Sequence, residues 1–188
     1  MSLFRLDASI LPGTSASAEL AGVIETEWTA GRPGALVVRR DLGSNPLPAD
    51  AWALATTLAA ELEDAEAVLL AVPLYNYGVS QHFKAWVDLI IAGAGAATPI
   101  LKGKPTVLVT VRGGGYGPGT PREGWDHSTP YLRRVLADMW EADLTVIERE
   151  LTLAGINPAM DALKDLAATL HSDALGAARE AGKALAIG

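Results

Sequence analysis

The segment VPLYNYG, residues 72–78, carries side chains suited to binding a flat ring. Leu74 supplies an apolar wall, and Tyr75 and Tyr77 supply aromatic faces and edges. Asn76 and the neighbouring backbone groups can form directional hydrogen bonds with the edge of a heterocycle. The alternative is that the two tyrosines only cover the core and keep their hydroxyls in water. Because the segment follows an unbroken aliphatic run, it is predicted to stand at the end of a buried strand.

A second segment, ASILPGTSAS at residues 8–17, places hydroxyl groups immediately before a predicted helix. Ser9, Thr14, Ser15 and Ser17 are not accompanied by any lysine or arginine. Hydroxyls and free N–H groups at a helix N-terminus suit a phosphate, because the helix dipole supplies positive potential without a formal cation. The alternative is that Ser15 or Ser17 is merely an N-cap. The segment lacks the G-x-x-x-x-G-K-[ST] pattern of a P-loop.

A third segment, RGGGYGPG at residues 112–119, is too rich in glycine to pack as a core element. Its backbone N–H groups can approach the edge of a ligand closely, because no Cβ atoms stand in the way. Arg112 can either balance negative charge on that ligand or pair with a carboxylate on the core side. No G-x-G-x-x-G pattern occurs, so a Rossmann dinucleotide site is not predicted.

The elements that must position these segments alternate between strands and helices. The predicted strands are Leu3–Ala8, Ala35–Arg39, Ala67–Val72, Thr106–Val111 and Leu144–Glu148. The predicted helices are Ala16–Ala30, Ala51–Leu62, one beginning at Val79, one with Thr129 as N-cap and Pro130 as first residue, and one beginning at Ala159. The helix after Thr129 has an apolar stripe of Leu132, Val135, Leu136, Met139 and Trp140. The helix from Ala159 has an apolar stripe of Met160, Leu163, Ala167, Leu170 and Ala174.

This alternation predicts an α/β fold, a three-layer sandwich with helices on both faces of a five-stranded parallel sheet, for which we expect the strand order 2-1-3-4-5. In such a sheet the loops after the first, third and fourth strands meet at the topological switch point. These are the three segments described above, whereas the loop after the fifth strand is plainer. A phosphate-binding loop at residues 8–17, aromatic side chains at residues 72–78 and a glycine-rich backbone at residues 112–119, all at one edge of the sheet, together predict a site for flavin mononucleotide (FMN).

Composition limits the other possibilities. The chain has 188 residues without a break in composition, so residues 1–188 are expected to form one domain. The net charge of -7 gives no basic surface for nucleic acid, and no apolar run is long enough to span a membrane. Cysteine is absent, and no metal site is predicted. We expect a cytoplasmic protein, since the first residues do not resemble a signal peptide.

The three segments also resemble the FMN-dependent NADH azoreductases and NAD(P)H quinone reductases, a flavodoxin-like family once called acyl-carrier-protein phosphodiesterases. SILPGTSAS is similar to the family's phosphate loop, VPLYNYGVSQHFKAWVD to its P-[ML]-Y-N-F segment and following helix, and VRGGGYG with TPYL to its S-R-G-G stretch. The resemblance implies homodimers in which hydride passes from NADH or NADPH to FMN and then to a quinone or azo compound, in a ping-pong cycle.

The resemblance also implies roles for individual residues. The residues expected to bind FMN are Ser9, Ser15, Ala16, Ser17, Pro73, Leu74, Tyr75, Asn76, Tyr77, Arg112, Gly113, Gly114 and Tyr116. Of these, Tyr116 is the candidate proton donor on the substrate side, with water as the alternative. Val111 stands where the family has serine, and substrate-side segments depart from the family pattern. One remaining alternative is a flavin protein without turnover, such as an electron carrier or redox sensor. A hydrolase is less favoured, because this sequence contains no G-x-S-x-G motif.

Overall fold

The computed structural model describes residues 2–11, 15–48 and 50–187 and contains a five-stranded parallel sheet. The strands are β1 (Ser2–Asp7), β2 (Leu36–Asp41), β3 (Ala67–Ala71), β6 (Pro105–Val111) and β7 (Asp143–Arg149). Their order across the sheet is β2-β1-β3-β6-β7, which confirms the predicted 2-1-3-4-5 arrangement. The switch point therefore lies between β1 and β3.

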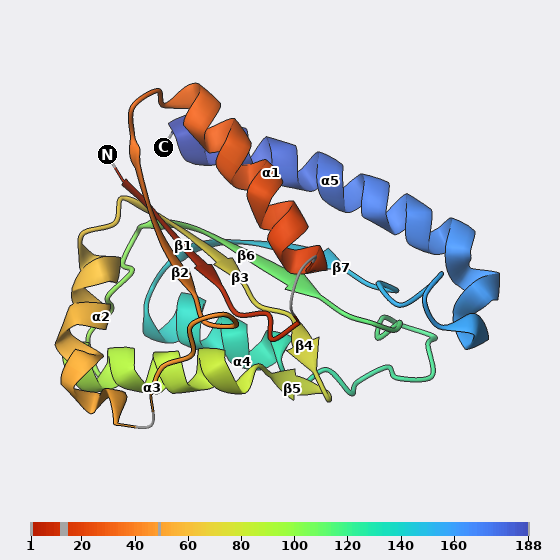
Figure 1. The fold of residues 1–188 in the computed structure, drawn as a ribbon, viewed down its shortest axis with the longest axis horizontal. Coiled ribbons are helices and arrows are strands. Elements are labelled where there is room, and N and C mark those ends of the chain that lie inside the picture. The colour runs from red at the N-terminus through yellow and green to blue at the C-terminus, as the bar shows by residue number, and fades with distance from the viewer. Residues whose placement is uncertain (1, 12–14, 49, 188) are drawn as a thin grey trace.

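Helices cover both faces of the sheet, as predicted (Figure 1). One face carries α1 (Ala16–Gly31) and α5 (Lys164–Ile187), and the other carries α2 (Ala55–Glu63), α3 (Gln81–Ala94) and α4 (Thr129–Arg133). Short helical turns precede or follow three of these helices: η1 (Ala51–Leu54), η2 (Arg134–Met139) and η3 (Pro158–Leu163). A small hairpin of β4 (Leu74–Tyr75) and β5 (Gly78–Val79) stands at the end of β3.

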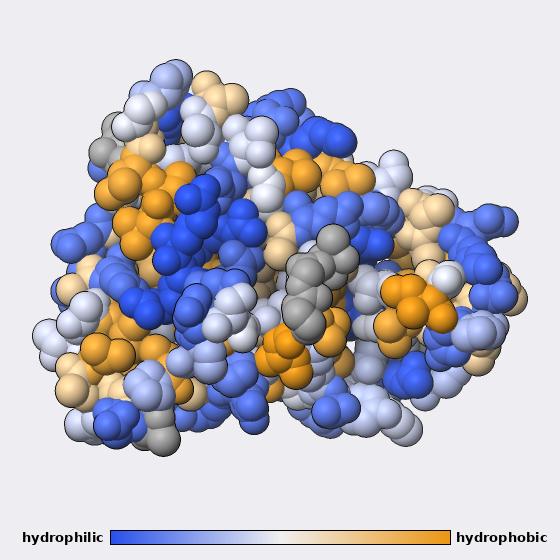
Figure 2. Space-filling view, in the orientation of Figure 1, coloured by the Kyte–Doolittle hydropathy of each residue, from blue (hydrophilic) through white to orange (hydrophobic). Residues whose placement is uncertain are grey.

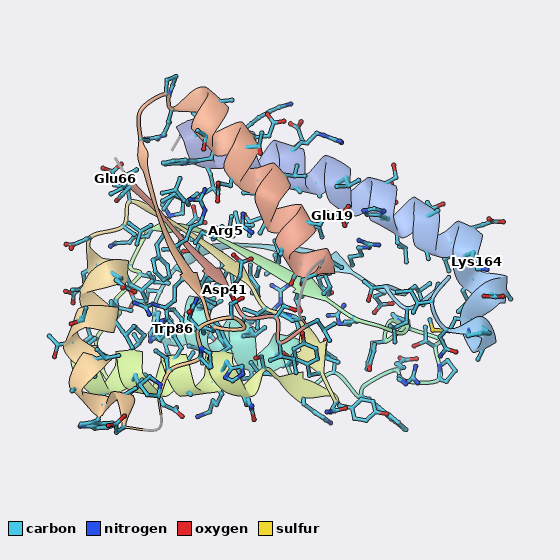
Figure 3. All side chains as sticks on the ribbon, in the orientation of Figure 1. Arg5, Glu19, Asp41, Glu66, Trp86 and Lys164 are labelled. Atoms are coloured by element: carbon cyan, nitrogen blue, oxygen red, sulfur yellow. The ribbon has the colours of Figure 1, made fainter. Side chains whose placement is uncertain are left out.

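The core is divided by the sheet into two clusters of buried apolar side chains. All five residues of β3 are buried, because this central strand is covered on both faces. On the α3 side lies Trp86 (Figure 3). Its ring stacks on Phe4 with ring centroids 6.1 Å apart and meets Trp140 edge-on. On the α1 side the largest buried residue is Trp28. Both layers fix the sheet and hence the loops that leave its carboxyl edge.

Two helix predictions need correction near the site. Ser128, not Thr129, is the N-cap position of α4, so Thr129 is already helical. The chain then continues as the π-helix η2, in which the N–H of Trp140 bonds to the carbonyl of Val135. Because a π-turn holds more residues than an α-turn, it rotates Met139 out of the predicted stripe, and 39% of its surface is exposed.

The last helix also differs from its prediction. Met160 and Leu163 belong to the 3-10 helix η3, and α5 begins only at Lys164. The first buried residue of α5 is Ala174, so the predicted stripe over residues 160–170 does not pack on the sheet. Instead, this end of α5 projects beyond the carboxyl edge of the sheet (Figures 1 and 3).

None of the helices in the described part of the chain combines the length and the hydropathy needed to cross a membrane.

Candidate functional site

The loops after β1 and β3 are in direct contact. The hydroxyl of Tyr75 lies 3.0 Å from the hydroxyl of Ser9 and accepts a hydrogen bond from the N–H of Ile10 at 3.2 Å. From the end of β5, the buried hydroxyl of Ser80 donates to the carbonyl of Ala8. The prediction that these two loops meet is therefore confirmed, and Tyr75 acts as the link between them.

The N-terminus of α1 lacks a side-chain cap. Ser15 occupies the N-cap position, but its hydroxyl pairs at 2.9 Å with that of Ser17 instead of capping the helix. The first intrahelical bond runs from Glu19 N–H to Ser15 carbonyl, which leaves three N–H groups at residues 16–18 without an acceptor within the described residues. Ser17 itself is fully buried. Thr14 lies outside the described residues.

The β4–β5 hairpin holds two consecutive residues in the left-handed conformation. Asn76 has φ 48° and Tyr77 has φ 68°, which is the pattern of a two-residue type I′ turn. Asparagine tolerates this region, but tyrosine is strained there by about 1–2 kcal/mol. The Tyr77 ring packs edge-on against Tyr116 and Trp125, and its carbonyl accepts a hydrogen bond from the N–H of His127. The ring of Tyr77 is thus held against the loop that follows β6, although its backbone is strained.

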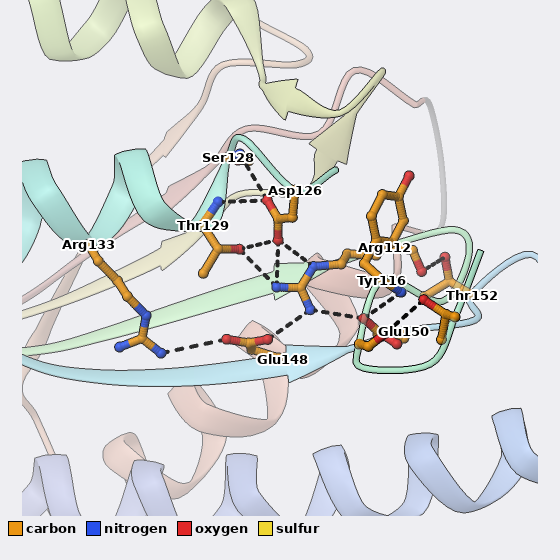
Figure 4. Close-up of polar contacts among 11 residues, drawn as sticks. Arg112, Tyr116, Asp126, Ser128, Thr129, Arg133, Glu148, Glu150 and Thr152 are labelled. Carbon is orange, nitrogen blue, oxygen red and sulfur yellow. Dashed lines mark hydrogen bonds and ion pairs between the residues drawn. The ribbon is translucent and has the colours of Figure 1, made fainter. Parts of the chain in front are cut away.

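Arg112 is buried and is held by carboxylates, which is the second of its two predicted alternatives. Its guanidinium donates to Asp126 at 2.7 Å and to Glu148 at 2.7 Å, and it lies 3.4 Å from Glu150 (Figure 4). A fourth bond goes to the hydroxyl of Thr129. The side chain does not line the cavity described below, and it ties the glycine segment to α4 and β7.

These contacts fix the charge states in the cluster. Burial alone would raise the pKa of Asp126, but hydrogen bonds from Thr129 and the charge of Arg112 outweigh it, so the pKa lies below its usual value. Burial alone would lower the pKa of Arg112, but the bond to Glu148 and the nearby carboxylates raise it. Asp126 also accepts from the N–H groups of Ser128 and Thr129, and so caps α4.

The glycine segment presents its backbone toward a cavity. The carbonyls of Gly113 and Gly114 accept from the N–H groups of Leu153 and Leu151, whereas their own N–H groups have no acceptor in the described part of the chain. A Cβ atom on Gly113 would lie 2.7 Å from the side chain of Leu153, so the close packing here requires glycine. Two N–H donors are therefore available to a ligand edge.

The cavity has a volume of about 240 Å³ and brings together seven of the predicted residues. The predicted residues that line it are Leu74, Tyr75, Asn76, Tyr77, Gly113, Gly114 and Tyr116. Its remaining wall is formed by Arg122, Leu153, Asn157 and Met160. The sequence does not predict this wall, because the loop after β7 carries no motif and the spacing of Met160 is typical of a helix stripe. Pro73 is buried behind the lining.

Tyr116 stands on the wall of this cavity as a protonated phenol. Burial raises its pKa, and the charge of Arg122 only partly offsets this effect. At neutral pH its hydroxyl can therefore donate a hydrogen bond but cannot serve as a base. Its backbone N–H donates to the Glu150 carboxylate at 3.0 Å, and its ring contacts Tyr77 and the Arg122 guanidinium.

A larger hollow of about 330 Å³ lies on the other side of the first loop, toward β2. Ser9 and Ser15 line it, together with the carboxylates of Asp7 and Asp41. Burial alone would raise the pKa of Asp41, but hydrogen bonds from Ser44 and Gly43 lower it, so this group stays ionised. Arg5 also lines this hollow and pairs with Asp7 at 2.8 Å, so Ser9 and Ser15 face a hollow of mixed charge, whereas the aromatic side chains line the cavity described above.

A doubly wound parallel sheet of this strand order, with a lined cavity beyond the carboxyl ends of β3, β6 and β7, places this chain in the flavodoxin-like class of α/β proteins. Residues 1–173 match the family model described as "Flavodoxin-like fold", and the chain belongs to that family.

Named relatives cover nearly the whole chain. The FMN-dependent NADH:quinone oxidoreductase of Kineococcus radiotolerans is 39% identical, covering 97% of this chain and 99% of its own length. That of Streptomyces avermitilis is 38% identical over 95% of each chain. Among solved structures, the FMN-dependent NADH-azoreductase from Bacillus anthracis, in complex with FMN, aligns with a TM-score of 0.79 at 12% identity, covering 99% of this chain and 100% of its own.

Proposed function

We propose that the chain is an FMN-dependent NADH:quinone oxidoreductase that also accepts azo compounds, with residues 1–188 acting as one domain. The single observation that carries the proposal is the cavity that joins an aromatic hairpin to a glycine segment with free N–H donors, because its residue Tyr75 is also bonded to the loop that leads to the uncapped N-terminus of α1. The names of relatives that align over almost the full chain support the same activity.

The residues at the first loop fit the phosphate of FMN. The free N–H groups at the start of α1, with the hydroxyls of Ser9 and Ser15, offer donors without a formal cation. Ala16 and Ser17 would contribute through their backbone N–H groups, because the hydroxyl of Ser17 is buried behind Ser15. We thus assign Ser17 a backbone role and Ser15 a side-chain role.

The cavity residues fit the ring system of FMN. Leu74, Tyr75 and Tyr77 would line the ring, and Asn76 would bond to its edge. The free N–H groups of Gly113 and Gly114 would face the polar edge of the ring. In this proposal, Arg112 does not touch the flavin but positions these two glycines through its carboxylate partners.

Bound FMN would supply the hydride chemistry of both half-reactions, with NADH or NADPH as donor. The protein orients the co-substrate between Tyr77, Tyr116 and Met160 and keeps water from the apolar wall. Tyr116, protonated at neutral pH, would donate a hydrogen bond to the oxygen or nitrogen of the acceptor. The reaction then needs no base from the chain.

We also propose that the protein forms a homodimer through the surface around the cavity mouth. The large apolar side chains exposed there are Tyr77, Trp125, Leu153, Ile156, Leu163 and Leu166. Figure 2 shows apolar side chains gathered among hydrophilic ones over the loops at this end of the molecule. The first ten residues of α5 bury no side chain in the monomer, and such a short unsupported stretch is only marginally stable. A second copy would cover both features.

The proposed function is tested by reconstituting the protein with FMN and mixing it anaerobically with NADH. We expect the flavin absorption to bleach, and to return when menadione or a neutral azo dye is added. Parallel runs with NADPH give the donor preference. A yellow protein that neither NADH nor NADPH reduces would contradict the reductase function and would leave an electron carrier or sensor.

A further inference from the structure

Among the described residues that line the cavity, Arg122 is the only one whose side chain carries a formal charge. The nearby carboxylates Glu148 and Glu150 are bonded to Arg112 and do not line the cavity. The cavity therefore presents one cation on an otherwise apolar or neutral wall. In a chain of net charge -7, this local excess of positive charge requires a specific explanation.

The guanidinium of Arg122 is held in place by the Tyr116 ring and by the space beside Gly114. It lies over the Tyr116 ring, with Cζ 5.9 Å from the ring centroid, in a cation–π contact. On its other side, a Cβ atom at Gly114 would stand 2.5 Å from Nη1, so the absence of a side chain at Gly114 makes room for the guanidinium. The side chain is thus held at the cavity wall although it belongs to an exposed loop.

No carboxylate within ion-pair distance of Arg122 is found in the described part of the chain. Most other arginines do have such a partner: Arg5, Arg32, Arg39, Arg40, Arg112, Arg133, Arg134 and Arg149. The adjacent Glu123 bonds instead to the N–H of Gly119. The donors of the Arg122 guanidinium therefore remain available to a ligand.

We propose that Arg122 determines substrate specificity by binding an anionic group on the molecule that stacks against the flavin. The proposal rests on the proposed function and names its substrate class: a flat, largely apolar molecule that carries a carboxylate, sulfonate or phosphate. The apolar wall of Leu153 and Met160 takes the ring, and the planar guanidinium takes two oxygens of the acid group. That group belongs either to the electron acceptor or to the phosphates of the nicotinamide dinucleotide.

The binding test needs no turnover. Isothermal titration calorimetry on the FMN-loaded protein compares naphthalene-2-sulfonate with the neutral naphthalene-2-sulfonamide. In Arg122→Gln we expect sulfonate affinity to fall about five- to tenfold while sulfonamide affinity is unchanged, as for one partly exposed charge-assisted contact. Arg122→Lys retains the charge and should lose less. Arg179→Gln, an exposed arginine on α5 that does not line the cavity, is the matched control and should bind both probes as the wild type does.

Stopped-flow measurements of flavin reduction and reoxidation then identify which molecule carries the anionic group. If the dinucleotide phosphates are bound, Arg122→Gln slows reduction by NADH but not by the phosphate-free donor 1-benzyl-1,4-dihydronicotinamide. If the acceptor is bound, the variant slows reoxidation by anthraquinone-2-sulfonate but not by menadione. Equal losses for charged and neutral probes, or no loss for either, would overturn the proposal. A wild-type protein that binds the sulfonate through Arg122 but is not reduced by NADH would instead refute the reductase function.

Discussion

At the scale of single residues, Tyr77 is the most informative position. The sequence predicts that its ring contacts the flavin, but only the structure reveals a left-handed backbone at φ 68°. A glycine would adopt this turn without strain, so the presence of tyrosine indicates that its ring outweighs the cost of its backbone. Contacts with Tyr116 and Trp125 then hold the ring at the cavity wall.

Replacing Tyr77 therefore separates binding from stability. We expect Tyr77→Gly and Tyr77→Ala each to weaken FMN binding about tenfold, because both remove one aromatic contact of roughly 1–1.5 kcal/mol. Only Tyr77→Gly relieves the left-handed strain, so its apoprotein should be more stable than that of Tyr77→Ala by about 1 kcal/mol. Fluorescence titration of apoprotein with FMN and thermal denaturation measure the two quantities.

His171→Ala provides the control for this comparison. His171 lies on α5, contacts Glu19 at 2.8 Å and does not line the cavity. The His171→Ala variant should therefore retain FMN as the wild type does. Equal FMN content in Tyr77→Gly and His171→Ala would contradict the placement of the flavin ring.

At the scale of elements, the site depends on how closely α1 and α5 approach each other. A Cβ atom at Gly182 would lie 2.6 Å from the backbone carbonyl oxygen of Ile24 in α1. The two helices can pack at this distance only because Gly182 has no side chain. Since α1 supplies the free N–H groups at the first loop, a shift of α1 also moves the predicted phosphate site.

Two glycines on α5 give a matched pair. Gly182→Ala should destabilise the protein by about 1–3 kcal/mol, because the new methyl group overlaps the backbone of α1. Gly176→Ala meets no atom within 4 Å and should stabilise the helix by about 0.5–1 kcal/mol. Urea denaturation of the apoproteins measures both changes. Similar free energies of unfolding for the two variants would show that the helices can separate without cost.

At the scale of the whole molecule, the end of α5 has no support within one chain. Helix α5 is 24 residues long, but all of its buried residues lie from Ala174 onward. The exposed residues Ile156 and Leu166 lie next to this end, beside the proposed flavin cavity. Burial of this surface against a second copy would both complete the core of α5 and close the cavity mouth.

The dimer is tested by charging this surface. We expect the wild type to elute with the mass of two chains in size-exclusion chromatography with light scattering, since its exposed apolar surface favours association. The double variant Ile156→Asp and Leu166→Asp should dissociate to one chain of 19.6 kDa. Leu36→Asp changes an exposed leucine on the edge strand β2, whose exposed fraction of 62% lies between those of Leu166 and Ile156. This variant is the control and should remain dimeric. A wild type with the mass of a single chain at micromolar concentration would refute the homodimer.

Much of this organisation follows from the sequence alone. Aliphatic runs alternate with helical patterns, and parallel strands with right-handed crossovers leave few topologies, so the order of the five strands could be predicted. The three candidate segments were located because each follows a predicted strand of one sheet. Seven of the predicted residues do line one cavity, because strand ends in a parallel sheet share one edge.

Only the tertiary structure decided which partner each polar side chain takes. The sequence left Arg112 between a ligand and a carboxylate, and that choice depends on Asp126 and Glu148, which are distant in the chain. The cavity wall of Leu153 and Met160, and the free guanidinium of Arg122, likewise depend on where three separate loops come to rest. Periodicity along a chain reports which faces are buried, whereas pairing between side chains is set by distances in space, which no local pattern encodes.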